Sequence, residues 1–248
     1  MKILEVQGLT KYFGGVAALK DVSFDVPERQ ICGFIGPNGA GKTTLFSVIS
    51  GTFRPTAGRV RLRGQDVTGK HPARLVKMGI ARTHQVVRPF RALTVIENVR
   101  LAVHFGRHGA SAGRSAPERA MDVLRQVGLD KKADVLASAL SLGEQKRLEV
   151  ARAVATGAEL LLLDEICGGL NTTETRAMLD LVRKIRDDGA TIMYVEHDMK
   201  AVMSVCDRIT VLDFGQKLAE GKPEEIQNND AVIKAYLGKP TLESGPGA

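Results

Sequence analysis

Tryptophan is absent from this sequence, and aromatic residues of all kinds make up only 4% of its 248 positions. The core therefore has to be built mostly from aliphatic side chains, and the hydrophobic share of 44% is sufficient for that. Basic patches with interleaved aromatic residues, which proteins that bind single-stranded nucleic acid use, are missing. We therefore expect no nucleic acid partner.

Cysteines are few, and their arrangement excludes two classes of protein. Cys32, Cys167 and Cys206 are odd in number, far apart and without a CxxC pair. A disulfide framework and a cysteine-rich zinc site are therefore not expected, and a reducing cytosol fits best. Cys167 lies beside two acids, Asp164 and Glu165, but nothing around it suggests use as a nucleophile.

Long apolar runs are also missing. The strongest run, Leu160 to Leu163, is far too short to cross a bilayer. The N-terminus, Met1 to Glu5, reaches an acid at once and contains no apolar signal core. If the protein works at a membrane, we expect it to bind there as a peripheral subunit.

What the chain does have is room for a large core and an excess of positive charge. Its length suits one large α/β domain or two small ones. Lysine and arginine total 35 against 28 acids, which gives a net charge of +7. This balance favours anionic partners such as nucleotide phosphates, nucleic acid or an acidic membrane surface, and does not choose among them.

Strand and helix signals alternate along the chain as they do in a parallel α/β fold. Strands are expected at 22–26, 31–35, 60–63, 160–163 and 191–195, with helices near 42–50 and 173–187 and a hairpin over 208–219. Residues 88–157 instead read as helical. Thr94 and Glu97 form a capping-box pattern there, a Gly/Ser-rich loop is expected at 106–116, and Pro117 suits the first turn of the next helix. The pattern predicts a parallel-sheet core interrupted by a helical insertion, with a closing helix from Pro223 onward.

The segment Gly36-Pro37-Asn38-Gly39-Ala40-Gly41-Lys42-Thr43 carries the clearest chemistry. It matches G-x-x-x-x-G-K-[ST], follows an expected strand and opens an expected helix. Glycines let consecutive backbone N–H groups point at phosphate oxygens, and the helix presents its positive end to the same anion. Lys42 is placed to neutralise the β- and γ-phosphates, and the Thr43 hydroxyl to ligate Mg²⁺. Thr44 belongs to the same nucleotide-binding set.

A second segment ends an apolar strand in two acids, Asp164 and Glu165. Asp164 is expected in the Mg²⁺ shell, and Glu165 is expected to act as general base on the attacking water. By itself an apolar strand ending in acids is commonplace. Beside a phosphate loop it indicates a nucleotide hydrolase.

A third segment, Leu140 to Gln145, precedes a helix. Ser141 with Glu144 three residues later fits a helix N-terminus, and an end with a small hydroxyl and Gly143 can also bind an anion. Taken alone, this segment is better explained as a plain helix cap.

These segments, in this order, resemble the ATP-binding cassette (ABC) ATPases over roughly Leu4 to Leu237. The resemblance implies a P-loop NTPase (RecA-like) core with an antiparallel β subdomain and an inserted α-helical subdomain. We expect a single domain over 1–248, with the core at about 1–87 and 158–248 and the helical subdomain at about 88–157. The implied ligands are ATP and Mg²⁺.

The resemblance also implies roles for individual residues. Phe13 stands where an aromatic stacks on adenine, with Tyr12 as the alternative. Gln85 stands where a glutamine reaches Mg²⁺ and the attacking water, and His197 where a histidine contacts the γ-phosphate. The segment Leu140 to Glu144 resembles the family signature, which caps the ATP held by a second subunit. Ser141 and Gly143 are therefore expected to act in trans, in a homo- or heterodimer, and Glu144 belongs to the same nucleotide-binding set.

The sequence departs from the family pattern at three positions. Leu142 stands where a second glycine is commoner in the signature, and Ile166 stands where proline usually follows the two acids. Asn171 stands where the next loop usually carries an aspartate. These departures concern coupling between subunits rather than ATP binding.

The ATPase subunits of branched-chain amino-acid importers are a closer match. The supporting pieces are Phe-Gly-Gly near the start, 88–99, Glu196 to Met199, and the closing 233–238. This resemblance implies permease subunits as partners, a solute-binding protein as an indirect partner, and a place on the cytoplasmic face of the inner membrane. The alternatives are a lipopolysaccharide-export ATPase and a cassette ATPase acting on nucleic acid. The solute itself is not encoded in this chain.

Overall fold

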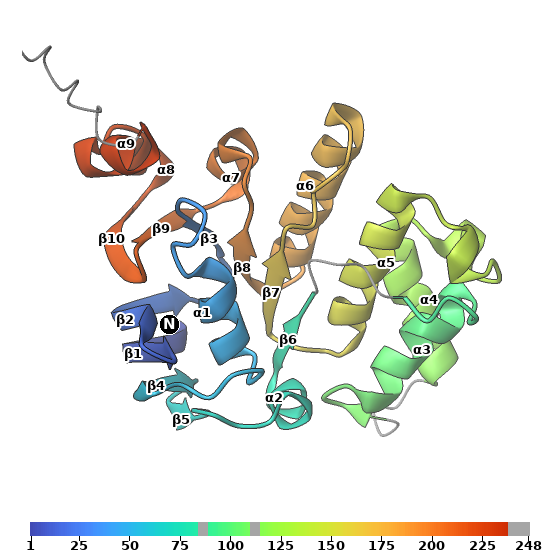
Figure 1. Cartoon of the computed structure of the whole chain (residues 1–248). Coiled ribbons are helices and arrows are strands. Elements are labelled where there is room, and N and C mark those ends of the chain that lie inside the picture. Colours follow the sequence, from blue (N-terminus) through green and yellow to red (C-terminus); the bar gives the residue numbers. More distant parts are fainter. Residues whose placement is uncertain (84–88, 110–114, 238–248) are drawn as a thin grey trace, which may run out of the picture.

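The computed structural model of the chain describes residues 1–83, 89–109 and 115–237, and it contains two β-sheets (Figure 1). The smaller sheet is antiparallel, with the strand order β2-β1-β4-β5. Its strands are β1 (Lys2–Phe13), β2 (Val16–Pro27), β4 (Ala57–Leu62) and β5 (Gln65–Asp66). It corresponds to the antiparallel subdomain that the family resemblance implies.

The larger sheet has the strand order β10-β9-β3-β8-β7-β6. Its neighbouring strands from β9 to β6 run parallel, and only β10 pairs antiparallel with β9. The strands are β3 (Ile31–Ile35), β6 (Ile80–Arg82), β7 (Leu160–Asp164), β8 (Thr191–Val195), β9 (Arg208–Asp213) and β10 (Gln216–Gly221). This arrangement confirms the expected α/β fold with a parallel-sheet core.

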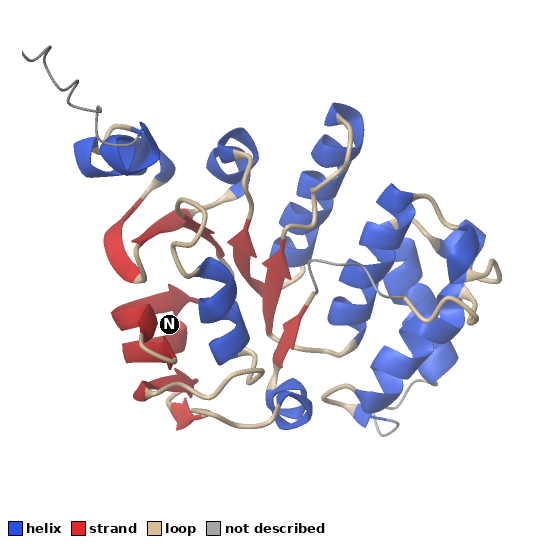
Figure 2. Cartoon of the chain, viewed as in Figure 1, coloured by secondary structure: helices blue, strands red, loops and turns tan. Residues whose placement is uncertain are grey.

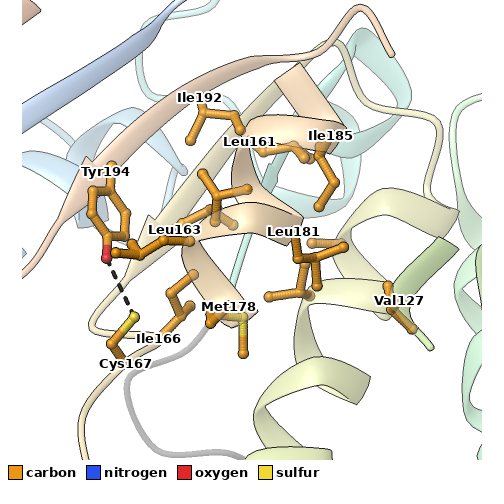
Figure 3. Close-up of a cluster of buried hydrophobic side chains, with 14 of the residues drawn as sticks. Val127, Leu161, Leu163, Ile166, Cys167, Met178, Leu181, Ile185, Ile192 and Tyr194 are labelled. Atoms are coloured by element: carbon orange, nitrogen blue, oxygen red, sulfur yellow. Dashed lines mark hydrogen bonds between the residues drawn. The ribbon is translucent and has the colours of Figure 1, made fainter. Parts of the chain in front are cut away.

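The central strands are apolar throughout because both faces of the larger sheet are covered. Leu160 and Leu162 pack in one buried cluster with helix α1 (Lys42–Ile49) and the smaller sheet. Leu161 and Leu163 point the other way, into a second cluster with helix α6 (Thr172–Asp187) (Figure 3). Helix α1 therefore lies between the two sheets, as Figure 2 shows.

The segment between β6 and β7 supplies the expected helices. They are α3 (Val95–Phe105), α4 (Ala116–Val127), the short turns η2 (Asp130–Lys132) and η3 (Ala137–Ala139), and α5 (Leu142–Ala155). The three long helices pack on one another. Thr94 and Glu97 form the predicted capping box, and Ser115 and Glu118 form a second one that starts α4. Residues 110–114 of the expected loop lie outside the described part of the chain.

The remaining helices are α2 (Pro72–Met78), α7 (Met199–Val205), α8 (Pro223–Gln227) and α9 (Asp230–Leu237). The expected closing helix is thus two helices, separated around Asn228 and Asn229. Strand β1 is not predicted from the sequence, and its irregular register explains why. Register shifts between Lys2 and Leu4 and again after Val6 break the alternation by which a strand is recognised.

Candidate functional site

The phosphate loop connects β3 to α1, and its glycines are required by the backbone that surrounds it. A Cβ built on Gly36 would lie 2.1 Å from the carbonyl oxygen of Leu212. Gly41 has a φ of +100°, and its Cβ would lie 2.6 Å from the carbonyl oxygen of Ala18. A side chain at either position would therefore collide with backbone from β9 or β2.

A hollow of about 310 Å³ opens over this loop. It brings the loop together with Glu165, after β7, and His197, after β8, because the carboxyl ends of neighbouring parallel strands meet at one edge of the sheet. Its lining residues are Ala18, Asn38, Gly39, Ala40, Gly41, Lys42, Thr43, Thr44, Glu165 and His197.

Lys42 is held inside the loop. Its Nζ donates hydrogen bonds to the carbonyl oxygens of Gly36, at 2.6 Å, and Pro37, at 3.0 Å. Burial lowers the pKa of the Lys42 ammonium, and the nearby charges of Glu165 and Asp164 oppose that shift. The loop thus places the buried Lys42 ammonium at the hollow, with the two acids close to it.

Asp164 ends β7 and is 1% exposed. Its Oδ2 accepts a hydrogen bond of 2.7 Å from Arg82 on β6, whose guanidinium also donates to the hydroxyls of Ser47 and Ser50. Its Oδ1 has no hydrogen-bond partner within the described residues, although it is buried. A buried carboxylate oxygen without a partner among the described residues fits the oxygen ligands that Mg²⁺ takes.

The buried Arg82–Asp164 pair leads to a stability prediction. Arg82→Met is expected to lower the free energy of unfolding by about 3 kcal/mol or more, because it leaves an uncompensated buried charge on Asp164. Urea denaturation measures this. Arg61→Met, which alters the antiparallel sheet only, is the control and is expected to change little. An equal stability for Arg82→Met and the wild type would show that the pair does not stabilise the fold.

Glu165 and His197, which both line the hollow, contact one another directly. The Glu165 Oε1 lies 2.5 Å from the His197 Nε2, and the Glu165 backbone N–H donates to the carbonyl of Val195. Glu165 has a φ of +50°, a left-handed backbone conformation that residues other than glycine rarely adopt. Such conformations concentrate at functional sites, because only a surrounding structure that fixes them can hold them.

The signature segment lies in a different hollow, of about 280 Å³. Ser141 caps helix α5 in a capping box with Glu144, and Gly143 is buried beside Glu174. Leu170 and Glu174 also line this hollow, and it shares no lining residue with the hollow over the phosphate loop. Within the described part of the chain, Ser141, Gly143 and Glu144 therefore do not meet Lys42 in one cavity.

The expected aromatic contact is not part of this hollow. Phe13 does not line the phosphate-loop hollow; its ring packs edge-on against Phe53, with centroids 5.1 Å apart and the Lys11 Nζ 4.9 Å from the Phe13 centroid. Tyr12, the alternative, is 43% exposed and is not in the lining either. Gln85 lies outside the described residues.

Two of the departures from the family pattern have structural roles. Ile166 is 2% exposed and packs in the cluster drawn in Figure 3. Asn171 caps helix α6, since its Oδ1 accepts the backbone N–H of Glu174 at 2.9 Å. An asparagine side chain caps a helix as well as an aspartate does.

Sequence reasoning misses several residues that the structure places at the site. Arg82 binds Asp164, Lys146 on α5 donates to the carbonyl of Glu165, and Glu196 accepts the backbone N–H of Cys167. Ala18 lines the hollow from β2. For Arg82 and Ala18 no sequence motif signals the contact; for Glu196 the only signal is its place beside His197.

Comparison with known families and proteins identifies the family of this chain. Residues 19–168 match the family of ABC transporters, and residues 216–240 match the family described as branched-chain amino acid ATP-binding cassette transporter. The chain is 44% identical to the high-affinity branched-chain amino acid transport ATP-binding protein LivG of Salmonella typhimurium, over 96% of this chain and 98% of that protein. It is 42% identical to BraF of Pseudomonas aeruginosa, which has the same description, over the same shares.

Solved structures give the same result. A nucleotide-free ATP-binding cassette from an ABC transporter superposes with a TM-score of 0.86 at 31% identity, covering 96% of this chain and all of that one. A dimeric cassette in a post-hydrolysis state, bound to ADP and phosphate, superposes with a TM-score of 0.78 at 29% identity, covering 89% of this chain and 98% of that one. The fold, the phosphate loop and these matches together show that the chain belongs to the ABC transporter family, as an ATP-binding, ATP-hydrolysing cassette.

Proposed function

We propose that this chain is the motor subunit of an importer for branched-chain or other amino acids, and that it hydrolyses ATP at the phosphate-loop hollow. The observation that carries the chemistry is the composition of that hollow, where Lys42, Glu165 and His197 surround one cavity. The likeness to LivG and BraF, whose names describe branched-chain amino acid transport, supports the substrate class.

The proposed roles follow the positions of the side chains. The loop N–H groups and Lys42 bind the phosphates, and His197 contacts the γ-phosphate. Glu165 accepts a proton from the attacking water, which its position beside His197 supports. Thr43 and Asp164, together with Gln85, hold Mg²⁺, which neutralises charge on the phosphates when bound. Phe13, which is 42% exposed, is proposed to contact adenine.

A second cassette completes the site in this proposal. Ser141, Gly143 and Glu144 line a hollow separate from the phosphate loop, so the signature end of α5 is available to a partner's nucleotide. A helix N-terminus suits an anion. A related cassette forms a dimer in its structure with ADP and phosphate, and this supports the proposed arrangement.

The proposed membrane partners are permease subunits, with a solute-binding protein as an indirect partner, at the cytoplasmic face of the inner membrane. Across the described ranges 1–83, 89–109 and 115–237, no helix has the length and hydropathy that a membrane span needs.

We also propose the subdomain boundaries given above, with the helical part over about 88–157, because α3, α4 and α5 pack on one another between β6 and β7.

Phe90 marks the surface that we propose for the permease contact. Its side chain is 50% exposed, so it is not a core residue. It lines a hollow of about 310 Å³ with Leu101, Phe105 and Arg152, and the Arg152 guanidinium lies 5.1 Å from the Phe90 ring centroid. Asn98 fixes the Phe90 backbone by bonding both its N–H and its carbonyl. An apolar anchor beside charged groups suits a protein–protein contact.

Phe90→Ala is therefore expected to uncouple transport from hydrolysis. ATPase activity of the isolated subunit should stay within about twofold of the wild type, while uptake by the assembled transporter falls about tenfold or more, the loss expected for a truncated interface anchor. Parallel assays of phosphate release and of labelled amino-acid uptake in membrane vesicles measure both. Leu218→Ala, at a half-exposed residue on β10, is the control and should leave both activities unchanged. Uptake equal to the wild type in Phe90→Ala would remove Phe90 from this role.

A further inference from the structure

A buried lysine connects the signature helix to the catalytic acid. Lys146 lies on α5 and is 6% exposed. Its Nζ donates a hydrogen bond of 2.7 Å to the backbone carbonyl of Glu165, at the end of β7. A lysine is rarely buried unless its ammonium has partners. The partner here is the peptide of the proposed general base, and the proposed function gives that contact no role.

A buried glutamate holds the same segment through other backbone groups. Glu196 ends β8 and is 5% exposed. Its Oε1 accepts the backbone N–H of Cys167 at 2.6 Å, and its Oε2 accepts the backbone N–H of His197 at 3.3 Å. Burial raises the pKa of the Glu196 carboxyl, and these two N–H donors oppose the shift. One side chain thus fixes the segment after Glu165 and the segment that carries His197.

Together these contacts determine the backbone of residues 165–167. Glu165 has its left-handed φ of +50°, its N–H bonds the carbonyl of Val195, and its carbonyl bonds Lys146. Two residues later Glu196 holds the N–H of Cys167. A glutamate keeps a left-handed backbone conformation only where the surrounding structure fixes it, and these hydrogen bonds fix it here. The direction of the Glu165 side chain depends on that backbone.

We propose that Lys146 and Glu196 are positioning residues that orient the Glu165 carboxylate. Lys146 also couples this orientation to the position of the signature end of α5. The proposal rests on the proposed function, because it needs Glu165 as base and Ser141 at a partner's nucleotide. Lys146 is five residues from Ser141, about 7.5 Å along one rigid helix. A shift of α5 on binding the partner's ATP therefore moves the group that holds the subunit's own Glu165. The two ATP sites of a dimer communicate through this helix.

Lys146→Met and Lys146→Arg test the positioning role, because methionine lacks a donor and arginine retains one. Lys146→Met is expected to lower kcat about tenfold or more, while the KM for ATP and the melting temperature stay close to wild-type values, since small misplacement of a catalytic group costs rate. Lys146→Arg should recover most of the kcat. Lys184→Met, at an exposed lysine on α6, is the matched control. Glu196→Ala should also lower kcat while the KM for ATP stays close to the wild-type value. This variant serves as the test if Lys146→Met does not fold.

The coupling role has its own readout, the Hill coefficient for ATP hydrolysis. It should be above 1 in the wild type and fall toward 1 in Lys146→Met. An unchanged kcat in both Lys146→Met and Glu196→Ala overturns the positioning role, as does a loss that tracks the melting temperature without recovery in Lys146→Arg. An unchanged Hill coefficient overturns the coupling role. If instead the wild type does not hydrolyse ATP, or Glu165→Gln is as active as the wild type, the proposed function fails.

Discussion

Glu165→Gln is expected to reduce ATP turnover by about 100-fold or more while Mg-ATP binding stays intact. The amide has nearly the same shape as the carboxylate, so it still fits beside His197, but it cannot accept the proton of the attacking water. The variant should therefore accumulate as an ATP-held dimer. Steady-state phosphate release gives kcat, nucleotide titration gives the affinity, and size-exclusion chromatography with and without ATP gives the dimer.

Two further variants make this result specific. Lys42→Ala is expected to weaken nucleotide binding itself, because it removes the buried cation of the phosphate loop. Glu224→Gln, at an exposed acid on α8, should leave both turnover and affinity unchanged. Near-normal hydrolysis by Glu165→Gln would mean that another group is the base, and the short contact to His197 would then need a different explanation.

The phosphate loop and the strand before it are predictable from the sequence because their requirements are local. Successive N–H groups converge on an anion only where glycines allow the backbone to turn, so the chemistry fixes residue types at fixed spacing. The run from Leu160 to Leu163 reads as a buried strand for a similar reason, since both of its faces are covered. The capping box at Thr94 is equally local.

The contacts that complete the site are not local, and the sequence does not reveal them. Arg82 and Asp164 are 82 residues apart, and Glu196 reaches Cys167 across 29 residues. Only the order of strands in the larger sheet, with β6, β7 and β8 side by side, brings these pairs together (Figure 1). A buried lysine such as Lys146 reads in the sequence as an ordinary polar residue of an amphipathic helix.

Phe13 shows a different limit. The sequence pattern places an aromatic at the end of β1, and the structure has one there, but its ring contacts Phe53 rather than the hollow over the phosphate loop. Nothing in the sequence indicates that Phe53, which follows α1, lies within reach of the first hairpin. The adenine contact of Phe13 therefore stays a prediction.

The second large effect is expected from mixing two inactive variants. Ser141→Arg puts a long cationic side chain at the signature end of α5, and Lys42→Ala removes the phosphate-binding cation, so each variant alone should lose nearly all turnover. A mixed dimer has one site with both defects and one site with neither, if signature and phosphate loop act in trans. The separate hollows that these residues line are the structural basis for this expectation.

Turnover of that mixture is the most direct measurement of whether the chain is an ATPase with a site shared between two subunits. Each purified variant is assayed alone and then at a 1:1 ratio, at the same total chain concentration. The account predicts that the mixture hydrolyses ATP at least about tenfold faster than either variant, because each mixed dimer regains one complete site and such a site raises turnover by orders of magnitude. A mixture no more active than its components would contradict a site completed by a second copy.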